Sequence, residues 1–156
     1  MTIASRDYGP YYDDTLGDLY DEISAYEAEE DIWMLLPGTS NRPGNLALHL
    51  VGNLNHFIGF ALGETGYTRD RPAEFGDRDV SRTELLRMIS DTREMLKSVF
   101  ASLDDDLLQK PYPKPLWGDD QGTVQYFLNK LIWHLGYHVG QVNYHRRWAN
   151  SARDSG

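Results

Sequence analysis

The chain contains no cysteine, and this absence excludes several kinds of chemistry at once. Disulfide bridges, thiolate metal ligands and a cysteine nucleophile all require that side chain. The opening residues, MTIASRDYGPYYDD, also lack the basic and apolar regions of a secretory signal peptide. No apolar stretch approaches the ~20 residues that cross a bilayer. We therefore expect a cytoplasmic protein with no membrane span.

Clustered positive charge is missing as well. The chain has 15 Lys and Arg against 24 Asp and Glu, so its formal net charge is −9. Proteins that bind a nucleic-acid backbone present clustered Lys and Arg, and the only tight cluster here is Arg146-Arg147. We expect no nucleic-acid partner.

The composition is that of one globular domain. The chain has 156 residues, of which 40% are hydrophobic and 25% charged. We expect a single domain over residues 1–156 with its core over about 13–149. The last residues, 150–156, are small and polar and predict a flexible tail.

Helical periodicity dominates the chain, and no β pattern of comparable length competes with it. Four helices are predicted, over residues 13–36, 42–63, 81–103 and 123–149. Ser81-x-x-Glu84 has the spacing of a capping box at the start of the third helix. The connection over 63–80 is rich in Gly, Pro and charge, and three prolines exclude a regular helix over 110–118. This pattern predicts an all-α fold, a helical bundle that can hold a cofactor between facing helices.

Two histidines in the last predicted helix, His134 and His138, are four residues apart. Residues at this spacing lie about 40° apart around a helix and about 6 Å along it, so both rings can face one divalent metal. His49 lies in the second helix. If the two helices pack side by side, three neutral nitrogens converge and leave coordination positions for water or substrate. Leu135 stands where a zinc protease has its glutamate base, which disfavours that class.

Other polar residues share the faces of these histidines. His56 and His145 are each about 10 Å or more along their helices from the candidates, and we assign them structural roles at a bundle end or at the surface. Asn53 and Gln141 are candidates to orient an imidazole through its other nitrogen. A hydrogen bond to a buried backbone group is the alternative for both amides.

Three segments in this order are similar to one known family. They are Leu48-His49-Leu50-Val51-Gly52-Asn53, Arg69-Asp70-Arg71-Pro72-Ala73-Glu74-Phe75 and His134-x-x-x-His138-x-Gly140-Gln141. Together they resemble the DinB-like (YfiT-like) superfamily of metal-dependent enzymes, over roughly Leu16 to Trp148. The resemblance implies an up-down-down-up four-helix bundle, a homodimer, and a metal held by His49, His134 and His138.

The resemblance also implies a type of chemistry. Characterised members of the family include transferases and an isomerase that use low-molecular-weight thiols such as bacillithiol, mycothiol or glutathione. We therefore expect a metal-dependent transferase or hydrolase that activates a thiol cosubstrate or water and acts on a small-molecule substrate. Histidine ligands suit zinc or nickel first, and also iron or copper. The alternative is a metal-stabilised or metal-sensing dimer without turnover, because no general acid or base is recognisable beside the triad.

The segment with Arg71 and Glu74 has two interpretations. It closes over the site, or it clamps a long connection through an ion pair, and we favour the clamp. We interpret Trp133 and Tyr137 as packing residues. The apolar face of the first helix and Trp148 are candidates for the dimer contact.

Overall fold

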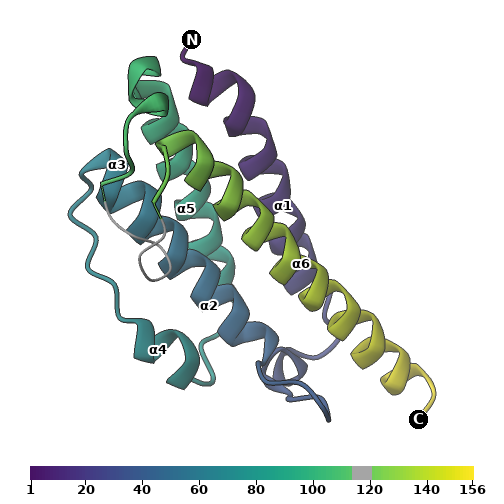
Figure 1. The fold of residues 1–156 in the computed structure, drawn as a ribbon. Coiled ribbons are helices and arrows are strands. Elements are labelled where there is room, and N and C mark those ends of the chain that lie inside the picture. Colours follow the sequence, from purple (N-terminus) through teal and green to yellow (C-terminus); the bar gives the residue numbers. More distant parts are fainter. Residues whose placement is uncertain (114–120) are drawn as a thin grey trace.

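The computed structural model describes residues 1–113 and 121–156, and every helix or strand assigned in these two stretches is a helix (Figure 1). The one β-type pairing within them is an isolated bridge between Pro111 and Thr123. The all-α class predicted from the sequence is confirmed for the described residues. Of the proline-rich segment 110–118, residues 110–113 are not helical, and the remainder lies outside the described residues.

The first predicted helix has the wrong bounds. A π-helical stretch, η1 (Ala4–Tyr8), leads into α1 (Gly9–Ser24), and the chain then forms the short 3₁₀ helix η2 (Glu29–Trp33). The predicted range of 13–36 is therefore wrong at its start and beyond Ser24. A tertiary contact accompanies the early end, because the Tyr26 hydroxyl makes a buried hydrogen bond with His145. If α1 continued past Ser24 as a regular helix, the position of Tyr26 would be set by the helix and not by this contact with His145.

The second predicted helix is present as α2 (Pro43–Leu54), the π-helical stretch η3 (Asn55–Phe60) and α3 (Ala61–Gly63). With a mean hydropathy of 1.2, this run is long and apolar enough to cross a membrane, so the expectation that no such stretch exists was wrong. Two thirds of the apolar window (67%) is buried inside the protein. Such burial is what the core helix of a water-soluble domain shows.

The connection after α3 contains a helix that the sequence pattern did not reveal. This helix, α4 (Arg71–Gly76), has Asp70 as its N-cap, and the Asp70 carboxylate accepts a hydrogen bond of 3.1 Å from the Ala73 backbone N–H. Pro72 occupies its first turn, where a missing N–H costs nothing. Six residues are too few for helical periodicity to be recognised.

The third predicted helix is α5 (Arg82–Ser102). Ser81 is its N-cap and accepts a hydrogen bond of 3.2 Å from the Glu84 backbone N–H, as predicted. The reciprocal half of the capping box is replaced, because the Glu84 carboxylate pairs with Arg87 one turn later.

A short 3₁₀ helix, η4 (Asp105–Gln109), precedes the last helix, α6 (Val124–Asp154). The predicted end at Ala149 is too early, and residues 150–154 are helical rather than irregular. Arg153 pairs with Glu30 and Asp31 of η2, and this contact ties the last turn of α6 to the rest of the protein.

The long helices pack so that α2 and α6 touch. α1 contacts α5 and α6, while α2 contacts α4, α5 and α6. Their buried apolar side chains form one cluster. On α6 the cluster includes all five predicted core positions, Leu128, Leu131, Leu135, Val139 and Val142. The contact between α2 and α6 is what positions the candidate site.

Candidate metal centre

Three imidazole rings meet where α2 lies against α6. His49 comes from the middle of α2, and His134 and His138 come from adjacent turns of α6. The Nε2 atom of His134 is 3.2 Å from Nε2 of His49 and 3.1 Å from Nε2 of His138. The three rings are nearly perpendicular to one another, with interplanar angles of 82°, 88° and 89°. The structure thus brings together all three histidines that the spacing singled out.

Two of these rings have their outer nitrogen engaged by an acceptor. His49 Nδ1 lies 3.0 Å from the Glu74 carboxylate, and His138 Nδ1 lies 2.6 Å from the Gln141 amide oxygen. Because both partners accept hydrogen bonds, each Nδ1 carries the ring proton and each Nε2 presents a lone pair. Both lone pairs face His134 Nε2, which has at most one proton to donate. A cation between the rings is the partner that satisfies all three nitrogens.

Burial keeps two of the rings unprotonated. Burial, with contributions from His138, His49 and Arg69, lowers the pKa of His134 to about 3. Burial also lowers the pKa of His138, although the hydrogen bond with Gln141 opposes it. Metal coordination requires neutral imidazole, so these two rings are in the binding form at neutral pH.

Glu74 supports His49 through a buried ion pair. Its carboxylate accepts two hydrogen bonds from the Arg69 guanidinium, each 2.8 Å long, and its side chain is 5% exposed. Burial raises the pKa of Glu74, but the hydrogen bonds from His49 and Arg69 outweigh burial, and the pKa is lowered. α2 makes room for this carboxylate at Gly52, where an added Cβ would lie 2.0 Å from Glu74 Oε2.

The ion pair in this segment involves a different arginine from the one proposed. Arg69 pairs with Glu74, whereas Arg71 lies over the Phe75 ring, 5.3 Å from its centroid. The clamp and the histidine site are also one arrangement, because the clamped carboxylate is the hydrogen-bond partner of His49. Sequence reasoning missed this link. The available signal was a glutamate that follows one arginine by three residues and another by five, and spacing alone does not choose between them.

The donor set fits a divalent transition metal. The three ligand atoms lie within 4.8 Å of one another. Zinc binds imidazole nitrogen at about 2.0–2.1 Å, so two nitrogens of a tetrahedral site are about 3.3 Å apart. The separations of 3.2 and 3.1 Å at His134 are close to that value. Three neutral nitrogens suit zinc, nickel, iron and copper, and in a tetrahedral site they leave one position open.

The other predicted side chains lie in different settings. Gln141 contacts His138, as its helix face suggested. The Asn53 side chain is buried, and its amide oxygen has no hydrogen-bond partner within the described residues. His145 is a structural residue, with Nδ1 bound to the Tyr26 hydroxyl and Nε2 bound to the Met34 carbonyl. His56 packs against the Phe57 and Phe60 rings.

The interpretation of two aromatic residues on α6 was wrong. Trp133 and Tyr137 are 66% and 55% exposed, so they do not pack inside the protein. Their rings stack on each other at the surface, with centroids 5.7 Å apart.

Comparison with known proteins identifies the family of this chain. A family model described as the DinB superfamily matches residues 18–142, which is most of the chain. This chain belongs to the DinB superfamily. No curated protein and no solved structure matches it. The family assignment therefore rests on the family model and agrees with the resemblance of the sequence motifs.

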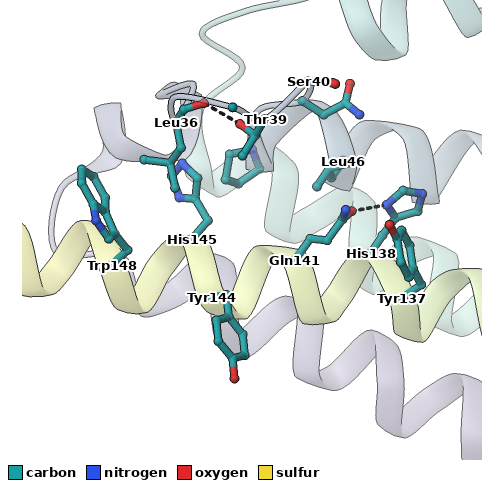
Figure 2. A pocket seen from close by; sticks show the side chains of 13 residues that line it. Leu36, Thr39, Ser40, Leu46, Tyr137, His138, Gln141, Tyr144, His145 and Trp148 are labelled. Carbon is teal, nitrogen blue, oxygen red and sulfur yellow. Dashed lines mark hydrogen bonds between the residues drawn. The ribbon is translucent and has the colours of Figure 1, made fainter.

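A pocket of about 710 Å³ begins next to the triad of this DinB superfamily member (Figure 2). His138 and Gln141 form one end of the pocket, and Trp148 lies toward the other end along α6. The segment from Leu36 to Pro43 forms the opposite wall. A small molecule at the His138 end of this pocket would be separated from the convergent Nε2 atoms by the His138 ring.

Proposed function

We propose that this protein binds one divalent metal through His49, His134 and His138 and uses it to activate a thiol cosubstrate or water. The observation that carries the proposal is the convergence of three Nε2 atoms, two of which present lone pairs. A metal held there would act as a Lewis acid and lower the pKa of a thiol or a water molecule next to it. Zinc and nickel are the first candidates for the metal, and iron and copper follow.

The chain's own residues prepare this site in two ways. Glu74 and Gln141 hold protons on the outer nitrogens of His49 and His138, and this fixes the direction of both lone pairs. Arg69 neutralises the Glu74 carboxylate, so the three neutral rings leave the metal's positive charge to its remaining ligand. The cosubstrate must supply the thiol, because the chain has no cysteine.

We also propose the up-down-down-up order for the four long helices α1, α2, α5 and α6. In Figure 1, α1 and α6 run in one direction along the bundle, and α2 and α5 run in the other. The contacts of α1 with α5 and α6, and of α2 with α5 and α6, support the same arrangement. The homodimer and the cytoplasmic location remain predictions, which sedimentation and cell fractionation would test.

Metal analysis is the experiment that tests the proposed site. Protein purified without a histidine tag is compared with the alanine variants of His49, His134 and His138. We expect about one metal per chain in the wild type and loss of that metal in each variant. His145→Gln is the matched control, because it removes a histidine from the same helix and leaves the triad unchanged. Unaltered metal content in the triad variants would overturn the proposal.

One observation favours the alternative function, a metal-stabilised or metal-sensing protein that catalyses no reaction. Glu74, the carboxylate that contacts the triad, is held by Arg69 and His49, so it is not a free general base. Cobalt-substituted protein separates the two functions. A thiolate-to-cobalt charge-transfer band on addition of glutathione supports thiol activation. Thermal stabilisation by metal, without that band and without hydrolysis of an activated ester, supports the metal-stabilised or metal-sensing protein.

A further inference from the structure

The pocket beside His138 has a wall that two interactions hold in shape. The Met34 carbonyl accepts a hydrogen bond of 2.8 Å from His145 Nε2 on α6. A turn follows, in which the Thr39 N–H donates to the Leu36 carbonyl and Gly38 has a φ of +79°. Pro37 and Gly38 are the residue types that a type II turn takes at its two central positions. The wall is therefore formed before any ligand arrives, which lowers the entropic cost of binding.

The lining of the pocket carries no formal charge. Among the 13 described residues that line it, none is Asp, Glu, Lys or Arg, although a quarter of the chain is charged. Leu36, Pro43 and Leu46 supply apolar surface, and Trp148 supplies a half-exposed indole. The lining side chains offer a charged ligand no ion pair in return for its lost hydration. An anion would also meet the field of a protein with a net charge of −9.

The polar groups at the triad end of the pocket favour a hydrogen-bond acceptor. The Gln141 amide oxygen is occupied by His138 Nδ1, while its NH₂ group has no hydrogen-bond partner among the described residues. Both nitrogens of His145 are engaged by Tyr26 and Met34, so His145 offers nothing to a ligand. Figure 2 shows Gln141 and Trp148 on the pocket side of α6, whereas Tyr144 points away from it. On the α6 side, Gln141 thus offers an amide donor and Trp148 an aromatic face, while Ser40 and Asn41 add polar side chains on the opposite wall.

We propose that this pocket binds an uncharged, planar molecule whose carbonyl oxygen accepts a hydrogen bond from the Gln141 NH₂ group while its ring packs against Trp148. The volume of about 710 Å³ lies within the range of small-molecule sites, about 300–1,000 Å³. This assignment rests on the proposed function and names its substrate class, a neutral planar carbonyl compound placed beside the metal site. The low-molecular-weight thiol, where it carries carboxylates, binds elsewhere.

Three planar isosteres test the charge of the ligand. Calorimetric titration of the metal-loaded protein with 2-naphthamide, 2-naphthoate and 2-naphthamidine compares a neutral amide, an anion and a cation of one shape. We expect the amide to bind at least about fivefold more tightly than either ion, because only the amide keeps an acceptor for Gln141 without burying a charge. Equal or tighter binding of either ion, or no binding of the amide, would overturn the proposal.

Two variants test the location. Trp148→Ala should weaken 2-naphthamide binding about tenfold by removing the aromatic face. Tyr126→Ala is the control, since Tyr126 is on the same helix and 45% exposed, against 50% for Trp148, but does not line the pocket. Equal losses in the two variants would place the ligand elsewhere. Metal content, measured on the same samples, separates the pocket proposal from the proposed function. Protein that holds metal but does not bind the amide would refute the pocket proposal. Protein that binds the amide but holds no metal would refute the proposed function.

Discussion

Helix α6 carries two histidine arrangements that differ in how their ring nitrogens are paired. At His145, Nε2 donates to a backbone carbonyl and Nδ1 accepts from the Tyr26 hydroxyl, so the neutral ring has both of its hydrogen bonds. Two to three turns earlier, the Nε2 atoms of His138 and His134 face each other, and His134 Nε2 also faces His49. Two of the three rings have their proton on the opposite nitrogen.

The comparison shows that burial alone does not distinguish a structural histidine from a metal ligand. Burial lowers the pKa of His134, His138 and His145 alike. The difference lies in the number of protons available to the facing nitrogens. His145 has one donor and one acceptor that match its partners, whereas the triad has more lone pairs than protons. A buried set of that kind is satisfied by a cation.

The largest expected effect is stabilisation by zinc, which should depend on the triad and not on His145. Zinc at about 1,000 times its Kd should raise the free energy of unfolding of the wild type by about 4 kcal/mol. His138→Ala should lose this gain, and His145→Gln should retain it. Thermal melts with and without zinc measure both. Equal stabilisation of the wild type and His138→Ala would show that zinc binds outside the triad.

The support beneath His49 gives the next largest effect. Arg69→Met should lower the free energy of unfolding by about 3 kcal/mol, because it leaves the buried Glu74 carboxylate without its ion-pair partner. Arg71→Met removes a guanidinium that lies over the Phe75 ring and should cost less than about 1 kcal/mol. Urea denaturation of both variants provides the measurement. A larger loss of stability in Arg71→Met than in Arg69→Met would instead support an ion pair between Arg71 and Glu74.

A third prediction concerns the space that Glu74 needs. Gly52→Ala places a Cβ 2.0 Å from Glu74 Oε2 and should displace that carboxylate from His49. Loss of a hydrogen bond that orients a ligand weakens metal affinity about 10- to 100-fold. Gly140→Ala is the control, because a Cβ there meets nothing within 4 Å, and should stabilise α6 by about 0.5–1 kcal/mol. Competition with a chelator measures affinity, and equal affinities in the two variants would contradict the role of Glu74.

The smallest effect is a pH dependence that isolates His145. Burial lowers its folded pKa despite the hydrogen bond to Met34 and nearby Asp31, so below pH about 6.5 the unfolded chain binds the proton more readily. Stability due to this ring is therefore present above that pH and is lost as the pH falls. His145→Gln offers the same donor and acceptor without titrating.

Denaturation at pH 7 and pH 5 compares the two proteins, and the triad is common to both. We expect the wild type to lose more free energy of unfolding between these pH values than His145→Gln. An equal loss would mean that His145 does not contribute to acid sensitivity.

Local patterns in the sequence were sufficient for much of this structure. Apolar spacing predicted α5 and the five buried core positions of α6, because one side of a helix recurs every 3.6 residues. The four-residue spacing predicted that His134 and His138 share one face of the helix. The three-residue spacing of His138 and Gln141 likewise predicted that these two side chains are neighbours. Each of these relations lies within a single helix.

Relations between distant segments required the tertiary structure. The convergence of His49 with α6 depends on how α2 packs, and the choice of Arg69 over Arg71 depends on the path of the chain around α4. The end of α1 at Ser24 accompanies the contact of Tyr26 with His145 on α6. The continuation of α6 to Asp154 accompanies the ion pair of Arg153 with Asp31 in η2. The neutral pocket combines the 36–43 segment with α6. Sequence alone determined which side chains share a helix face, because helix geometry is local, whereas packing decided which faces meet.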